Sequence, residues 1–127
     1  MFQVTSDPHR NRLYIILAGH LESEERQAAM RAVMTEAGKL APGFDVVTDI
    51  SALHATDQEG FKDFLRAKSS LKLKGVGKVV RVVKIPLSRI QLARISEAAG
   101  YHADHVDSIE EADRQLDELH AGVKEGT

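Results

Sequence analysis

The chain has 127 residues, of which 43% are hydrophobic and 28% are charged, and it contains no cysteine. This length suits one domain with a real hydrophobic core, and the composition is ordinary for a globular protein. The lack of cysteine excludes disulfides, thiolate chemistry and cysteine-ligated zinc. A net charge of −2 provides no basic footprint for nucleic acid. The N-terminus lacks an apolar signal core and no run is long enough to span a membrane, so we expect a cytoplasmic protein.

Two apolar runs at the N-terminus predict a β-hairpin. Met1 to Thr5 and Leu13 to Ala18 flank a segment rich in turn formers, Ser6 to Asn11. A helix should follow, with Ser23 as its N-cap and two glutamates in its first turn. The apolar residues of this helix recur every three or four positions, which predicts a stripe packed in the core: Met30, Val33, Met34, Ala37 and Leu40.

Phe44 to Ile50 is the next predicted strand, and its nearly continuous apolar run is typical of a parallel strand buried on both faces. A loop, Ser51 to Ala55, should lead into the sequence Thr56-Asp57-Gln58-Glu59, which matches a capping box. The helix that begins there should continue at helical spacing through Phe61, Phe64, Leu65, Lys68 and Leu71 and end at Gly75.

The last part of the chain predicts two more strands and two more helices. The strands are Lys78 to Ile85 and, with a weaker pattern, Tyr101 to Val106; a helix from Leu87 to Ala99 lies between them. Ser108 and Glu111 match a second capping box and open the last helix. We expect the chain to fray from Gly122 onward.

The predicted order is β-β-α-β-α-β-α-β-α in a single domain that covers residues 1–127. Such alternation indicates an α/β fold, with a mixed and largely parallel sheet flanked by helices. Ligands and partners of such sheets tend to bind at the carboxyl ends of the strands. The loop from Ser51 to Ala55 is predicted to lie at such an end.

The same region carries a resemblance to a known family. From Asp49 to Gly60 the chain is similar to the signature of the STAS domain of bacterial anti-sigma factor antagonists of the SpoIIAA type, which runs D-L-S-x-V-x-x-x-D-S-S-G. Asp49, Ser51, Asp57 and Gly60 match it at the family's spacing. The element order resembles the STAS fold over nearly the whole chain, so the resemblance implies a SpoIIAA-like regulatory module that binds a protein.

The chain departs from that signature at the residue that is phosphorylated in some members of the family. In phosphorylated members, a kinase that is also the anti-sigma factor modifies the second serine of the motif. Glu59 stands at that position here and Gln58 at the preceding one. Glutamate cannot accept phosphate and carries less charge than phosphoserine. The resemblance therefore implies an interaction module without that switch, unless Ser51 or Thr56 has taken the role. Glu59 can equally serve only to complete the capping box.

The interaction loop predicted on these grounds contains Asp49, Ser51, His54, Thr56, Asp57, Gln58, Glu59 and Gly60. A second reading stays open, because Gly19-His20-Leu21 resembles stand-alone SpoIIAA-like proteins that have been linked to lipids or other apolar ligands. In that case the site would be a groove between sheet and helices. A homodimer also stays open, since modules of this size often pair across a helix face or an edge strand.

Catalysis and metal binding have weak support in the sequence. His54 and Asp57 could form an acid-base pair of a hydrolase-type enzyme, but no nucleophile in a recognisable context accompanies them. The six histidines show no persuasive metal-ligand spacing. We therefore expect no catalytic residue, no cofactor and no metal.

Arg81 is the remaining residue of interest, since it interrupts the apolar run of the strand predicted from Lys78 to Ile85. A charge at such a position must be paired or reach the edge of the sheet. We expect either an ion pair, with Asp49 as the candidate partner, or a contact with an anionic ligand in a groove.

Overall fold

The computed structural model describes residues 1–54, 58–83 and 103–125 of the chain, with eight assigned elements. In chain order these are β1 (Phe2–Asp7), β2 (Arg12–Gly19), α1 (Ser23–Ala37), β3 (Asp45–Leu53), α2 (Gln58–Leu73), β4 (Val79–Val82), β5 (Ala103–Val106) and α4 (Ile109–Glu125). The predicted helix from Leu87 to Ala99 lies outside the described residues. The order of all the others agrees with the expected α/β alternation.

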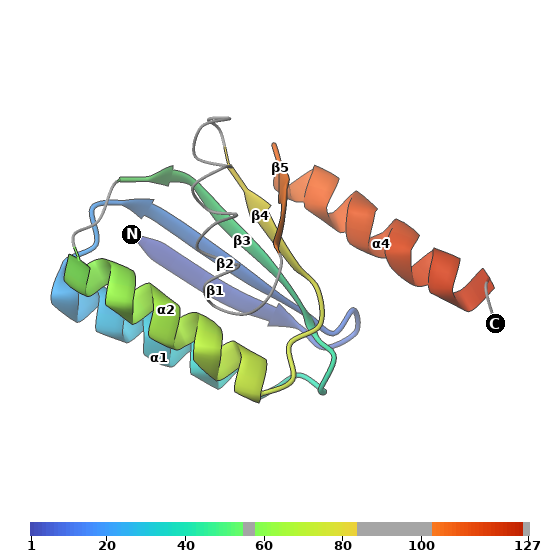
Figure 1. Ribbon diagram of the computed structural model, residues 1–127, viewed down its shortest axis with the longest axis horizontal. Helices are drawn as coiled ribbons and strands as arrows, with labels where there is room; N and C mark the ends of the chain where they lie inside the picture. The colour runs from blue at the N-terminus through green and yellow to red at the C-terminus, as the bar shows by residue number, and fades with distance from the viewer. Residues whose placement is uncertain (55–57, 84–102, 126–127) are drawn as a thin grey trace.

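The strands form one five-stranded sheet in the order β1-β2-β3-β4-β5 (Figure 1). β1 and β2 are antiparallel, as the predicted hairpin requires, and the three other pairings are parallel. Asn11 supplies the turn between β1 and β2 with a left-handed residue at φ 54°, a conformation that asparagine tolerates well. The carboxyl ends of β2, β3 and β4 therefore meet at one edge of the sheet.

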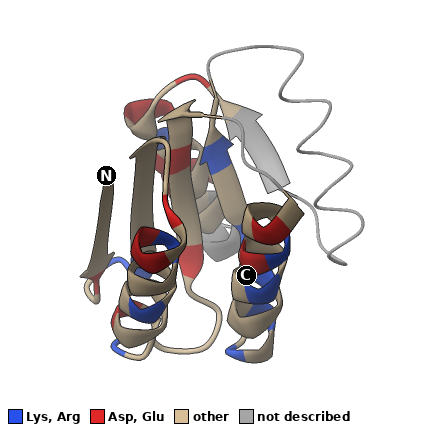
Figure 2. Ribbon diagram, turned by 90° about the vertical axis from the view of Figure 1, so that its left-hand side faces the viewer, with Lys and Arg blue, Asp and Glu red and all other residues tan. Residues whose placement is uncertain are grey.

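Helices cover the sheet on both faces. α1 and α2 lie side by side on one face, and α4 lies on the other (Figure 1). The central strand β3 contributes side chains to the core on both faces of the sheet. Val46 belongs to the core cluster under α1, and Val47 belongs to the cluster under α4. Burial of both valines confirms that this strand is covered on two sides. Figure 2 shows most of the charged residues on the helices, while the strands are mostly tan.

Several predicted boundaries differ from the structure. The N-cap of α1 is Glu22, whose carbonyl accepts from the Arg26 N–H at 2.8 Å, so Ser23 is the first helical residue and not the cap. β3 continues to Leu53 because the end of β2 keeps pairing with it beyond a register shift. Three residues predicted in the loop, Ser51 to Leu53, are therefore strand.

The C-terminal helix also differs from the prediction. α4 continues to Glu125 and so includes Gly122, where the sequence predicts that fraying begins. One glycine costs a helix only about 1 kcal/mol relative to alanine, which is not enough to end it. The predicted start is confirmed, because the Ser108 hydroxyl oxygen accepts from the Glu111 N–H at 3.1 Å. The Glu111 carboxylate, however, binds Arg114.

Candidate functional site

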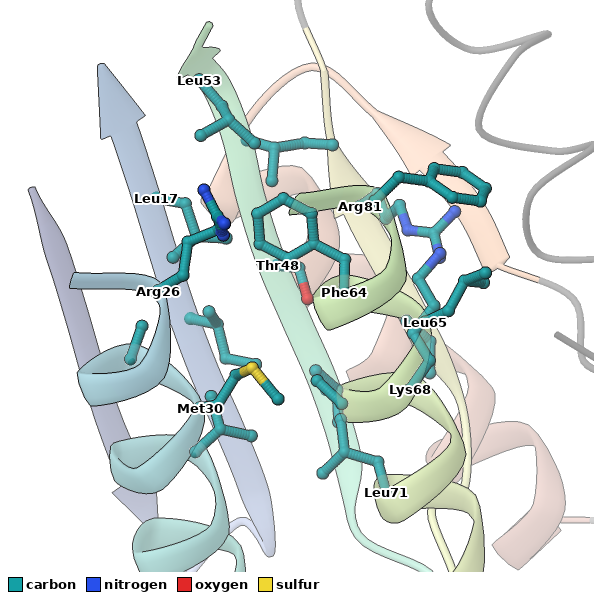
Figure 3. Close-up of a pocket in the computed structure, with 18 of the residues that line it drawn as sticks. Leu17, Arg26, Met30, Thr48, Leu53, Phe64, Leu65, Lys68, Leu71 and Arg81 are labelled. Atoms are coloured by element: carbon teal, nitrogen blue, oxygen red, sulfur yellow. The ribbon is translucent and has the colours of Figure 1, made fainter. Parts of the chain in front are cut away.

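A cavity of about 390 Å³ lies between the sheet and the two helices α1 and α2. Its lining comes from three neighbouring strands and both helices and is mainly apolar (Figure 3). Ile15 and Leu17 of β2 and Val46 of β3 form part of its floor, and they are buried core residues. The rest of the wall includes side chains that are only half-buried, among them Met30, Ile50, Leu53, Phe64 and Leu65. A cavity with such a wall has apolar surface available for a ligand.

The two helices that form the roof are joined by a buried ion pair. The Nε atom of Arg26 donates to the Asp63 carboxylate at 3.1 Å, and the side chains are only 6% and 9% exposed. Arg26 also donates to the Leu21 carbonyl at 3.0 Å. Leaving either charge without the other would be costly in this environment. The pair therefore fixes α1 against α2 at the edge of the cavity.

Two further cationic residues line the cavity, one from a helix and one from a strand. Lys68 comes from α2, and its side chain is half-buried. Arg81 comes from the middle of β4 and is 3% exposed. Figure 3 shows both side chains on the same side of the cavity, whereas Arg26 lies on the other side of Phe64. Burial, with a smaller effect from the Arg81 charge, lowers the pKa of Lys68 to about 7.

Arg81 does not face Asp49, the candidate partner for an ion pair. In the parallel register Arg81 lies opposite Thr48, and Asp49 lies opposite Val82. Because neighbouring residues of a strand point to opposite faces, Asp49 points away from the cavity face. Its carboxylate accepts from the Ser51 N–H at 3.0 Å and from the Ser51 hydroxyl at 2.6 Å. The cavity lining by Arg81 and Thr48 agrees with this register.

The described residues of the predicted interaction loop belong to the end of β3 and the start of α2. Asp49 and Ser51 form the hydrogen-bonded pair on β3, whereas His54 is exposed at the strand end and lines the cavity. Thr56 and Asp57 lie outside the described residues, and with them the first capping box and the predicted pairing of His54 with Asp57. The remaining three begin α2, where Gln58 and Glu59 are exposed and Gly60 is buried.

Sequence reasoning missed the buried charges of the helices. Arg26 precedes Met30 by four positions and Val33 by seven, so it continues the apolar stripe of α1 by one turn. Asp63 is placed in the same way between Gly60 and the cavity residue Ala67. A charged residue in register with an apolar stripe on each of two successive helices is a signal that could have predicted this ion pair.

Two other kinds of site can be addressed for the part of the chain that the structure describes. No group of three or more histidine, aspartate or glutamate side chains there is arranged to hold a metal ion. Within the same residues, no helix has the length and apolar character needed to cross a membrane.

Comparison with known proteins gives a match in structure but not in sequence. No protein-family model matches the chain, and a search of curated proteins finds no match. Among solved structures, an uncharacterised DUF3478-family protein with a SpoIIAA-like fold from Shewanella loihica is similar, with a TM-score of 0.74 at 14% identity. The alignment covers 91% of this chain and 93% of that chain.

Two further structures are similar over the same share of this chain. The phosphorylated form of the Bacillus cell fate determinant SpoIIAA aligns with a TM-score of 0.62 at 17% identity, covering 91% of this chain and 99% of that one. An anti-sigma factor antagonist from Mycobacterium paratuberculosis aligns with a TM-score of 0.59 at 15% identity, covering 91% and 94%. At these identities the likeness concerns the fold, and the chain has the SpoIIAA-like, or STAS, fold.

Proposed function

We propose that this chain, with its SpoIIAA-like fold, is a non-catalytic regulatory module that binds a small apolar molecule between its sheet and helices α1 and α2. The observation that carries the proposal is the cavity of about 390 Å³ lined by both helices and three strands. The cavity volume lies within the roughly 300–1,000 Å³ range of small-molecule sites.

The cavity wall supports a binding role more than a catalytic one. Its polar groups are few: Thr48, His54, Lys68, Arg81 and the ion-paired Arg26. Cations can orient a ligand but do not by themselves make a nucleophile and a matched acid and base. The SpoIIAA-like fold also includes anti-sigma factor antagonists, which supports a regulatory module over an enzyme.

Binding of a neutral amphiphile tests this proposal. We expect decanol to bind to the intact chain with roughly micromolar affinity, because each buried methylene contributes about 0.8 kcal/mol. Isothermal titration calorimetry should give one site per chain. Ala67 lines the cavity, so Ala67→Phe should fill it and weaken binding by at least about tenfold while the circular dichroism spectrum stays unchanged.

The matched control adds the same ring to an exposed position of the same helix. Ser69 is exposed on α2 and does not contribute to the cavity, so Ser69→Phe should bind decanol as the wild type does. If decanol does not bind to the wild type, or if both variants bind it equally well, the cavity is not the binding site and the proposal is wrong.

A second candidate function is protein binding at the start of α2. Its support is local exposure: Gln58 and Glu59 are exposed in the first turn, and Phe61 remains 39% exposed. An aromatic residue beside polar ones is typical of an interface. Glu59 would hold a constant negative charge where phosphorylated relatives carry the modified serine.

Native mass spectrometry with anti-sigma factors of the histidine-kinase type tests this second candidate. Wild type and Glu59→Ser should both form a complex, and only the variant should lose it when the kinase and ATP are present. Failure of both proteins to form any complex would rule out this partner class.

A further inference from the structure

Strand β1 presents an open edge at one side of the sheet. It is the first strand in the sheet order, and no described strand pairs with its outer side (Figure 2). Met1 and Ala18 exchange both backbone hydrogen bonds, at 2.9 and 3.0 Å. In an antiparallel strand the backbone groups of successive residues point alternately to opposite sides. The N–H and C=O groups of Phe2 and Val4 therefore point away from β2.

The next outward-pointing residue along this edge, Ser6, is already engaged. Glu36 of α1 accepts from the Ser6 hydroxyl at 3.2 Å and also from the Ser6 backbone N–H. The open part of the edge is therefore the stretch around Phe2 and Val4. Natural proteins commonly protect such edges with lysine, proline or a β-bulge. From Phe2 to Ser6 the sequence contains neither lysine nor proline, and the register with β2 is continuous.

The side chains along this edge are uncharged and alternate between the two faces of the sheet. Phe2 and Val4 are half-buried and pack against the core cluster under α1. Gln3 and Thr5 are exposed on the other face. A further strand beside β1 would cover the remaining apolar surface of Phe2 and Val4 without burying a charge.

Helix α1 has only small side chains where it overlooks the open edge. Glu25 pairs with the N-terminal amino group and Glu36 binds Ser6, so these two glutamates mark the side of α1 that lies above the edge. Ala28 and Ala32 lie between them at helical spacing and are half-buried. Small residues there allow the α1 helices of two molecules to lie side by side above one continuous sheet.

We propose that β1 pairs with β1 of a second copy of this chain, antiparallel about a two-fold axis at Gln3. In this register Phe2 lies opposite the partner's Val4, and Val4 lies opposite the partner's Phe2. Each pair would exchange two backbone hydrogen bonds and place an aromatic against a β-branched side chain. None of these residues lines the cavity, so the pairing is independent of the proposed ligand.

A second copy fits this edge because the edge is complementary to itself. The backbone groups that Phe2 and Val4 offer are the same groups that the partner needs, as an interface on a two-fold axis requires. An axis at Val4 would instead place the partner's Phe2 against the Ser6 amide, which Glu36 already holds. The register about Gln3 leaves that contact intact.

The paired segment is short, so the association should be weak but measurable. We expect a dissociation constant on the order of 10–100 µM. Sedimentation equilibrium of the full chain between about 5 and 500 µM spans this range. It should show a monomer in reversible equilibrium with a dimer.

Two charge variants test the position of the axis. Gln3→Lys places two lysines directly opposite each other, and this repulsion should raise the dissociation constant at least about tenfold. Thr5→Lys adds the same charge to the same face, but the partner's Met1 lies opposite, so the constant should change by less than about threefold. Both positions are exposed, so the circular dichroism spectra should match the wild type.

Single cysteines test the geometry directly, since the chain has no cysteine of its own. The two copies of Gln3 would form a non-hydrogen-bonded pair with Cα atoms about 4.5 Å apart, within the range of a disulfide. Gln3→Cys should therefore give a covalent dimer under mild oxidation. The two copies of Thr5 would lie about 14 Å apart, so Thr5→Cys should give only the background of random collisions.

The expected result is a dimer that Gln3→Lys weakens and Gln3→Cys cross-links, with little effect of either change at Thr5. Equal weakening by both lysines, or equal cross-linking of both cysteines, would place the axis elsewhere and overturn the pairing. A dimer that neither lysine weakens would have its interface on another surface. If the wild type stays monomeric and an added peptide with the sequence of residues 1–7 binds to it, the edge takes extended peptides and the second copy is wrong. A wild type that stays monomeric and binds no such peptide would also overturn the proposal.

Discussion

The guanidinium group of Arg12 lies on the face of the sheet that α4 covers. Its Nη1 atom donates to the Asp113 carboxylate at 2.7 Å and its Nη2 atom to Asp117 at 3.1 Å. Burial alone would lower the pKa of Arg12, but these two hydrogen bonds outweigh it and raise the pKa. Tyr14, two residues along β2, donates its hydroxyl to the same Asp113 oxygen at 2.7 Å. Arg10 also pairs with the second Asp113 oxygen at 3.5 Å. Asp113 therefore has three partners, whereas the hydrogen bond of Asp117 is to Arg12.

This difference predicts unequal effects of two conservative substitutions. Asp113→Asn removes the closer charge from an arginine that is 1% exposed, so it should lower the free energy of unfolding by about 2–4 kcal/mol. Asp117 is 59% exposed, and Asp117→Asn should cost less than about 1 kcal/mol. Urea denaturation of the two variants measures both values. Equal losses would show that Arg12 does not depend on Asp113.

The charge of Lys68 should destabilise the folded state, so that its removal should stabilise the protein. Its pKa falls from 10.5 to about 7 on folding, so between these values the unfolded chain binds more protons than the folded one. The free energy of unfolding therefore rises with pH across that window. The unfavourable contribution of the Lys68 charge reaches its full size below about pH 7. Without ligand, Lys68→Met should stabilise the protein at pH 7 by about 1–2 kcal/mol, a value reduced for partial solvent screening.

The pH dependence distinguishes this effect from ordinary repacking. The stability difference between Lys68→Met and the wild type should shrink as the pH approaches 10.5, and urea midpoints at several pH values would show it. Lys62 is exposed on the same helix, so the control Lys62→Met should show no pH-dependent difference from the wild type. A constant difference at all pH values would mean that the gain comes from packing of the methionine and not from the ammonium group.

The loops that precede β3 and β4 are held together by close backbone contacts. The Gly43 N–H donates to the Gly75 carbonyl at 2.7 Å, and the Gly77 N–H donates to the Phe44 carbonyl at 2.6 Å. A Cβ atom at Gly77 would lie 2.6 Å from the Gly43 carbonyl oxygen, which is part of the backbone and cannot swing away. Asp45 adds to this junction, accepting from the Lys78 N–H at 2.9 Å.

Substitution at this junction should consequently be costly. Gly77→Ala forces the two loops apart and should lower the free energy of unfolding by about 1–3 kcal/mol. Gly38 is the control, since a Cβ there would meet its nearest atoms at 3.3 and 3.4 Å and the residue is exposed at the end of α1. Gly38→Ala should change stability by no more than about 0.5 kcal/mol. Thermal and urea unfolding compare them, and a neutral Gly77→Ala would show that the junction can relax.

The arrangement of the whole molecule was predictable where the signals are local. The turn-rich segment before Arg12 indicated the hairpin, and the unbroken apolar run around Val46 and Val47 indicated a parallel strand covered on both faces. These patterns depend on residues a few positions apart. They were sufficient for the order of the described elements, whereas the SpoIIAA-like fold was expected from the resemblance to the family signature between Asp49 and Gly60.

What could not be predicted depends on residues far apart in the chain. Arg12 and Asp113 are separated by 101 positions, so no periodicity connects them. The exclusion of Asp49 as the Arg81 partner required the register between β3 and β4. The cavity itself depends on how α1 and α2 sit over the sheet, which the stripe of each helix does not specify. Arg81 stands out in the sequence as a charge within an apolar run, whereas Lys68 was predicted only as one of the residues at helical spacing in α2.

The sheet divides the described core into two clusters with different roles. One lies under α1 and α2 and contains the cavity, and the other lies under α4 around Val80, Val106 and Leu116. A ligand that binds only the folded state at 100 times its Kd adds about 2.7 kcal/mol to global stability. Local opening, however, should respond only where the ligand makes contact.

Saturation with decanol should therefore slow hydrogen exchange at amides that open locally in α1 and α2, while locally opening amides of α4 keep their rates. Exchange measured by mass spectrometry with and without decanol, in wild type and Ala67→Phe, checks this. Equal slowing in α4 would mean that the two faces open as one unit, and slowing in Ala67→Phe would place decanol outside the cavity.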